Sequence, residues 1–188
     1  AGITKFCIHP DHIFRNKPRV GGTKKVDHGK IDSIRPDLII ANKEENTRED
    51  IEILEKKYPV WISDISTLDD AIDMIHQLGE LNNKPDIAKI ITEKILSQFS
   101  SLQPVNGIKS LYLIWRAPYM AAGQGTFINN LMRRCGFTNV VAPKGRYPEL
   151  TSNEIRDLNP SLVLLSSEPY PFKEIHITEI KSILPDSQ

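Results

Sequence analysis

The chain has 188 residues, and its 24 Lys and Arg residues balance its 24 Asp and Glu residues, so the formal net charge is zero. A neutral chain gives no electrostatic reason to expect a nucleic acid or an anionic membrane as a partner. No apolar run approaches the roughly 20 residues that a membrane-spanning helix needs. Cys7 and Cys135 have apolar neighbours, which is typical of buried free thiols, and a disulfide between them stays open.

The first third of the chain predicts alternating strands and helices. Strands are expected at residues 3–8, 37–41 and 60–63, and helices at 29–35 and 48–58. The run at 37–41 is apolar throughout, as in a strand buried on both faces of a parallel sheet. Pro36 ends the helix before it, and Thr47 suits the cap of the next helix, with Asp50 at its third position. This rhythm favours a parallel sheet.

The middle of the chain predicts two consecutive helices. The first begins at Thr67, and the loop at 79–85 ends it. Pro85 suits the first turn of the second helix, which is expected to run to about Ser101. The expected inward stripes are Leu68, Ile72, Ile75 and Leu78 in the first helix, and Ile87, Ile91, Ile95 and Phe99 in the second. The second helix would be roughly 25 Å long, the width of a small domain.

The last part returns to strands and helices. Strands are expected at 108–115, 140–141 and 162–166, and helices at 125–135, 152–158 and 172–184. We therefore predict an α/β protein of two Rossmann-like lobes with parallel sheets, joined by a long connecting helix. The predicted segments are an N-terminal lobe at 1–66, connecting helices at 67–103 and a C-terminal lobe at 104–188. Both lobes read as incomplete, which predicts a truncated chain.

Two stretches, 124 positions apart, support two similar lobes. Residues 34–44 (IRPDLIIANKE) and 158–168 (LNPSLVLLSSE) each turn at a proline, run apolar, become polar and reach a glutamate. A repeat of this kind suggests two similar lobes, and two lobes suggest a cleft.

Candidate ligand-binding residues follow the predicted strands, because ligands of parallel α/β sheets sit beyond the carboxyl ends of the strands. In the second lobe these residues combine aromatic faces with arginines, which suits a bulky ligand bearing carboxylates, amides or phosphates. The candidates there are Trp115, Arg116, Tyr119, Met120, Arg146, Tyr147, Glu168 and Tyr170. Glu44 ends a strand of the first lobe. The alternatives are that Trp115 packs the sheet edge and that the glutamates only cap helices.

Neither a metal site nor catalysis is favoured. His9, Asp11 and His12 have suitable ligand types, but a closed metal site needs three or four converging donors. The chain lacks a Gly-x-Ser-x-Gly elbow, a Gly-x-Gly-x-x-Gly turn and a phosphate loop. Cys7 and His9 are a nucleophile and a base by type only. We therefore expect no enzyme, no metal and no cofactor.

Several short marks occur in a characteristic order. They are Gly2-Ile3-Thr4, Val20-Gly21-Gly22, residues 34–40, Val60-Trp61-Ile62-Ser63, the connecting helix, residues 127–131, Cys135-Gly136-Phe137 and Leu158-Asn159-Pro160. In this order they resemble the class III, helical-backbone substrate-binding proteins of ABC importers, in the cobalamin and iron-complex branch. The resemblance implies a receptor that holds cobalamin, haem or an iron-siderophore between two lobes. It also implies a monomer, a permease partner, and a periplasmic or membrane-anchored extracytoplasmic location.

The chain departs from the family pattern in two places. The glutamates that dock onto the permease correspond here to Gly29 and Asn153, and only neighbouring Glu154 could substitute. The positions matching the first-lobe aromatics of cobalamin receptors are Phe6, Thr23 and Asn42, which leaves Phe6 and Asn42 as candidate contacts. The alternative function is thus a non-transport ligand-binding or interaction module. A third reading is a receptor for a metal ion that uses His9 and His12.

Overall fold

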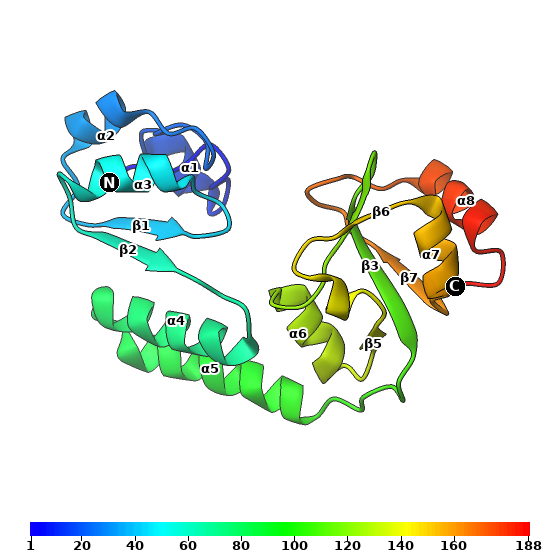
Figure 1. The fold of residues 1–188 in the computed structure, drawn as a ribbon. Coiled ribbons are helices and arrows are strands. Elements are labelled where there is room, and N and C mark those ends of the chain that lie inside the picture. Colours follow the sequence, from blue (N-terminus) through cyan, green and yellow to red (C-terminus); the bar gives the residue numbers. More distant parts are fainter. The chain divides into compact units, whose positions relative to one another are not determined.

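The computed structural model describes residues 1–188 and separates into two compact units, residues 1–64 and 65–188. The first unit is coloured blue to cyan in Figure 1, and the second runs from cyan-green to red. The α/β class expected from the sequence is confirmed, whereas the three segments at 1–66, 67–103 and 104–188 stay a prediction. None of the helices has the length and apolar character that crossing a membrane requires.

The first unit is built around two parallel strands, β1 (Ile39–Asn42) and β2 (Val60–Ser63), paired from Ile39 and Val60 onward. Helix α3 (Arg48–Glu55) connects them and is preceded by α1 (Asp11–Asn16) and α2 (His28–Ile34). Thr47 caps α3 as expected, since its side chain accepts a hydrogen bond from the Asp50 amide. The buried apolar residues of this unit are Ile31, Ala41 and Leu54.

Two expectations for the first unit are wrong. Residues 3–8 form no strand; Ile3 makes an isolated bridge with Arg19, and Phe6 is 62% exposed. Local hydrogen bonds, such as that from the Ile8 amide to the Phe6 carbonyl, fold this segment back on itself. Strand β1 is also not buried on both faces, because Ile40 is 55% exposed. A sheet of two strands leaves part of its surface without a covering layer.

The second unit begins with two helices that pack against each other, α4 (Leu68–Leu81) and α5 (Pro85–Ser100). A Cβ atom added to Gly79 would lie 2.5 Å from the Ala88 Cβ, so the glycine allows the close approach. Helix α4 therefore continues past Gly79, contrary to expectation. The expected stripe of α5 is wrong at Ile87 and Ile91, which are exposed, because the small residues Ala88 and Thr92 occupy the buried face.

The sheet of the second unit is mixed, not wholly parallel. Its central strand β3 (Lys109–Trp115) pairs in parallel with β5 (Thr138–Asn139) and β7 (Leu162–Leu165). It also pairs antiparallel with β4 (Tyr119–Ala121), which in turn pairs with β6 (Glu149–Leu150). The reversal occurs at residues 116–118, where Ala117 takes a φ of 65°. The sequence did not predict this hairpin, and β5 lies two residues before the expected strand at 140–141.

Three helices complete the second unit: α6 (Phe127–Arg134), α7 (Ser152–Leu158) and α8 (Glu174–Ile183), with a 3-10 turn η1 (Ala142–Lys144). Helices α7 and α8 pack against each other (Figure 1). The core of the unit combines residues of the sheet with residues of α7 and α8. Its buried members are Leu111, Leu113, Tyr119, Ala121, Val141, Leu150, Ile155, Ile180, Ile183 and Leu184.

The sequence repeat corresponds to a repeated local structure. Helix α2 and helix α7 each bury one isoleucine, Ile31 and Ile155. Each helix ends at a residue in the left-handed conformation, Arg35 with φ 49° and Asn159 with φ 43°. A proline comes next in both copies, and then a parallel strand, β1 or β7.

Candidate functional site

The candidate site lies at the carboxyl ends of β3 and β7. The two strands are parallel, with Leu113 opposite Leu165, and the Ser166 amide donates to the Leu113 carbonyl. The residues directly after the two strands therefore share one edge of the sheet. Strand β3 ends at Trp115, the hairpin turn after it supplies Arg116, and the segment after β7 supplies Tyr170.

Aromatic rings form the outer part of this site. Trp115 and Tyr170 meet edge to face, with ring centroids 5.5 Å apart. Phe172 contacts the other side of the group, 4.8 Å from the Tyr170 ring. Trp115 remains 40% exposed although it is held in place. An exposed, braced indole offers a rigid apolar surface on which a flat group can stack.

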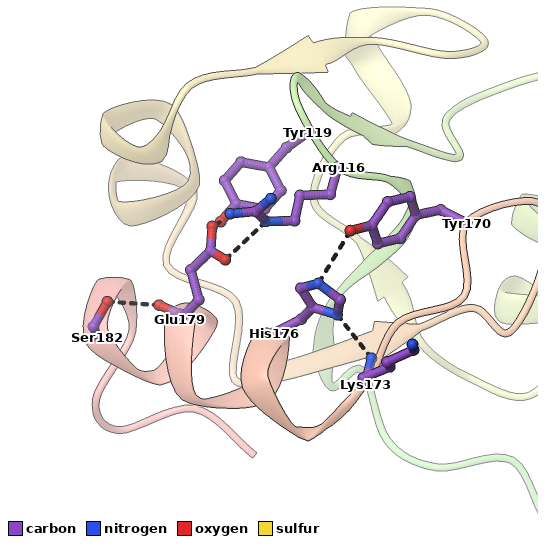
Figure 2. Close-up of polar contacts among 7 residues, drawn as sticks. All are labelled: Arg116, Tyr119, Tyr170, Lys173, His176, Glu179 and Ser182. Carbon is purple, nitrogen blue, oxygen red and sulfur yellow. Dashed lines mark hydrogen bonds and ion pairs between the residues drawn. The ribbon is translucent and has the colours of Figure 1, made fainter.

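Polar contacts beneath the rings converge on Glu179 of α8 (Figure 2). The Arg116 Nε donates to one carboxylate oxygen at 2.8 Å, and the Tyr119 hydroxyl donates to the other. The hydrogen bond from Tyr119, followed by the hydrogen bond from Arg116, lowers the pKa of Glu179 despite its partial burial. Burial, reinforced by the Glu179 carboxylate, raises the pKa of Tyr119 to about 12. Glu179 is therefore ionised and Tyr119 neutral near pH 7.

His176 lies one turn before Glu179 on α8 and holds Tyr170. Its Nδ1 accepts a hydrogen bond from the Lys173 amide at 2.8 Å, so the proton of the neutral ring is assigned to Nε2. The Nε2–H then donates to the Tyr170 hydroxyl at 3.0 Å. Figure 2 shows His176 between Tyr170 and Lys173. One helix thus positions residues from both strand ends.

The structure brings four of the predicted contacts together: Trp115, Arg116, Tyr119 and Tyr170. Tyr119 is buried, only 9% exposed, so its ring belongs to the core and offers no stacking surface. Met120 is half-buried in β4, opposite Glu149. Glu168 is exposed on the segment after β7.

Arg146 and Tyr147 lie beside the other end of β4. The Arg146 carbonyl accepts from the Gly123 amide, which places this loop level with the residues after β4, away from the turn at 116–118. The Arg146 guanidinium lies 5.7 Å from the Tyr147 ring centroid. Tyr147 is 39% exposed and forms a second aromatic surface on the same unit.

The candidates of the first unit are more polar. Phe6 is exposed. Asn42 shapes the turn after β1, because its Oδ1 accepts from the Glu44 and Glu45 amides and its Nδ2 donates to Ser63. Glu44 is half-buried in that turn. A hollow of about 430 Å³ along α3 and β2 includes Asn42 in its lining.

Residues 1–188 contain neither a disulfide nor a cluster of side chains that could hold a metal ion. Cys7 and Cys135 are both free, and Cys7 is exposed, so its expected burial is wrong. The short turns around residues 4–8 leave that segment on the surface. No group of three His, Cys, Asp or Glu side chains converges as a metal site would require.

Glu179 and His176 were not predicted from the sequence as site residues. The available signal was their spacing of three residues in a predicted helix, which places both on one face. It was weak, because polar pairs at this spacing usually lie on the solvent face of a helix. Contacts with Arg116, Tyr119 and Tyr170 identify them.

The family model described as periplasmic binding protein matches residues 3–181. The chain belongs to this family. The resemblance to receptors of the cobalamin and iron-complex branch is thus confirmed at the level of family and fold. A search of the curated proteins found no match.

Solved structures share the fold of the family member. The vitamin B12-binding protein BtuF of Vibrio cholerae is 21% identical with a TM-score of 0.76; the match covers 98% of this chain and 74% of that one. A periplasmic heme-binding protein of Pseudomonas aeruginosa is 18% identical, with coverages of 98% and 70% and a TM-score of 0.78. An Fe3+-hydroxamate transport protein of Saccharomonospora viridis is 18% identical, with coverages of 95% and 67% and a TM-score of 0.67. The chain thus spans about three quarters or less of these relatives.

Proposed function

We propose that this family member binds a metal complex, such as cobalamin, haem or an iron-siderophore, and acts as the substrate-binding protein of an ABC importer. The main support for this proposal is the exposure of Trp115. Its side chain is 40% exposed, while the Tyr170 ring contacts it edge to face at the sheet edge. Arg116 follows Trp115 in the chain, and Glu168 is exposed on the segment after β7. Tyr147 and Arg146 form a second proposed contact surface at the other end of β4.

The exposed indole of Trp115 can gain free energy when a ligand covers it. Fully burying a large apolar side chain gains about 1.5–3 kcal/mol. Because Trp115 is 40% exposed, a flat ligand that covers it can gain about 1 kcal/mol of this. Tyr170 and its hydrogen bond to His176 limit ring motion, so little side-chain entropy is lost on binding. The role is therefore binding and not catalysis, as in the family.

The proposed partners and location derive from the relatives. Those from Vibrio cholerae and Pseudomonas aeruginosa are described as periplasmic, and the Saccharomonospora viridis protein as part of an ABC-type transport system. We extend this to the present protein: an extracytoplasmic monomer that delivers its ligand to a permease.

A second candidate, a binding module without transport, is favoured by the residues at the docking positions. The family resemblance implies glutamates at two positions that are Gly29 and Asn153 in this sequence. Glu154, the neighbouring acid, is used locally: it accepts from the Thr151 amide and pairs with Lys144. Its counterpart Lys30 pairs with Asp27. Ligand-stimulated capture of the cognate permease supports transport, and binding of ligand without such capture supports the module.

Calorimetry with hemin, cyanocobalamin and a neutral ferric trihydroxamate tests the binding surface. We expect at least one probe to bind and Trp115→Ala to weaken it at least tenfold, with an unchanged circular dichroism spectrum. Leu102→Ala is the matched control, because Leu102 is exposed to the same degree, at 41%. Equal affinity of the wild type and Trp115→Ala would remove Trp115 from the site.

A further inference from the structure

Arg116 already has an internal anionic partner. The sequence suggested that this arginine pairs with anionic groups of a ligand, but its Nε donates to the Glu179 carboxylate at 2.8 Å. The pair is partly shielded, with side-chain exposures of 37% and 31%. The contact links the turn after β3 to α8, elements 63 positions apart in sequence, and so depends on the tertiary fold.

The pair consists of one guanidinium and one carboxylate, so its two charges balance each other. Both Glu179 oxygens are engaged, one by Arg116 and one by the Tyr119 hydroxyl, which is neutral. The neighbouring His176 is engaged elsewhere, because its Nδ1 accepts from the Lys173 amide and its Nε2 bonds the Tyr170 hydroxyl. The arginine charge is therefore balanced from within the protein.

We propose that Glu179 is a specificity-determining residue, the internal counter-ion of Arg116, and that it selects an electrically neutral metal complex over one with free carboxylates. This inference rests on the proposed ligand-binding function and names the ligand class for that surface.

The selection arises from charge repulsion at short range. A ligand carboxylate that approaches Arg116 also approaches the Glu179 carboxylate, and the attraction and repulsion largely offset each other. An amide or hydroxamate oxygen accepts a hydrogen bond from a terminal nitrogen of Arg116 without the same repulsion. Glu179 also keeps the guanidinium oriented, so that the neutral acceptor meets a fixed donor.

Competition between probes of different charge tests the proposal on the whole chain. Hemin carries free carboxylates, whereas cyanocobalamin carries amides, and a neutral ferric trihydroxamate is a second uncharged probe. We expect the wild type to bind a neutral probe more tightly than hemin. We expect Glu179→Gln to improve hemin affinity at least tenfold relative to that neutral probe. The double variant Arg116→Gln with Glu179→Gln removes both charges and should bind hemin more weakly than Glu179→Gln does, because the unpaired guanidinium is gone.

The outcomes separate this inference from the proposed function. If the wild type binds a probe but Glu179→Gln leaves the hemin-to-neutral ratio unchanged, or if wild-type hemin binding is the tightest, the role of Glu179 is overturned. If the wild type binds none of the three probes, the proposed function fails and this inference with it.

A salt series on the wild type tests the same point without any variant. We expect hemin affinity to change less than about threefold between roughly 50 and 500 mM NaCl, since no uncompensated cation faces it. A fall of more than about tenfold would overturn the proposal.

Discussion

The two copies of the repeat share a backbone and differ in the segments beyond their strands. Each has a helix that buries one isoleucine, a left-handed cap, a proline and a parallel strand. After β1, Asn42 folds its side chain back onto the Glu44 and Glu45 amides, which closes a polar turn. The segment after β7 instead carries Tyr170 against Trp115. The repeated elements therefore define a scaffold, and the segments beyond the strands define its chemistry.

The difference arises from the neighbours of each strand. Strand β1 pairs with β2 alone. Strand β7 pairs with β3, which ends at Trp115 and is followed by Arg116. Helix α8 then supplies Glu179, which binds Arg116, and His176, which binds Tyr170. The same local sequence pattern thus leads to a polar turn in one unit and to a braced aromatic surface in the other.

The largest expected effect is the loss of stability when the buried isoleucine of each repeat copy, Ile31 or Ile155, is replaced by alanine. Ile155 is fully buried in the core of the second unit, whereas Ile31 retains 6% exposure in the smaller first unit. We expect Ile155→Ala to lower the free energy of unfolding by about 4 kcal/mol and Ile31→Ala by about 2–3 kcal/mol, because the cavity at Ile155 has less room to collapse. Urea unfolding followed by circular dichroism measures both. Equal losses would mean that the two scaffolds are equally well packed.

Alkaline pH should lower the free energy of unfolding through two tyrosines, one in each unit, whose pKa values are raised in the folded protein. Burial raises the pKa of Tyr119 to about 12, and the hydrogen bond to Asp32 raises the pKa of Tyr58 in the first unit. A raised pKa gives stability that is complete below the unfolded value near 10 and is lost as the pH rises through the folded value. We expect roughly 2 kcal/mol to be lost between about pH 10 and 12 through Tyr119.

Tyrosine-to-phenylalanine variants test this assignment. Tyr119→Phe should flatten the alkaline part of the profile of unfolding free energy against pH, and Tyr58→Phe should flatten it less. The measurement is urea unfolding at intervals across the alkaline range. A profile for Tyr119→Phe that stays as steep as the wild type would show that another group causes the loss.

Glycine at the two left-handed caps gives the smallest expected effect. Arg35 and Asn159 both have positive φ, and asparagine tolerates this conformation better than a long side chain does. We expect Arg35→Gly to stabilise the protein by about 0.5–1 kcal/mol and Asn159→Gly by about 0.3 kcal/mol or less. Thermal unfolding compares the two. A larger gain at Asn159 than at Arg35 would contradict the expectation that asparagine tolerates the left-handed conformation better than arginine does.

Local signals predicted most of the elements. Strand β2 at 60–63 and helix α7 at 152–158 occur where expected, and Thr47 caps α3. The predictions failed where an alternating or periodic apolar pattern had no neighbouring element to pack against. The segment at 3–8 alternates but folds on itself, and α5 buries Ala88 and Thr92 in place of the larger Ile87 and Ile91.

The candidate site was predictable in part. The rule that ligands lie beyond strand ends singled out Trp115, Arg116 and Tyr170, which the structure brings together with Glu179 and His176. It also singled out Tyr119, which the fold buries, since the hairpin turns its ring into the core. Alternation in a strand three residues long cannot tell one face from the other.

By itself the sequence determined the α/β class, the repeated helix–proline–strand unit and the aromatic character of the second strand-end surface. These properties depend on neighbours within a few residues: caps, prolines and apolar runs. Only the tertiary structure decided that Arg116 is balanced by Glu179, that His176 holds Tyr170, and that Trp115 stays exposed. Charge pairing between α8 and a distant hairpin depends on how the helix packs on the sheet, and no local pattern records that geometry.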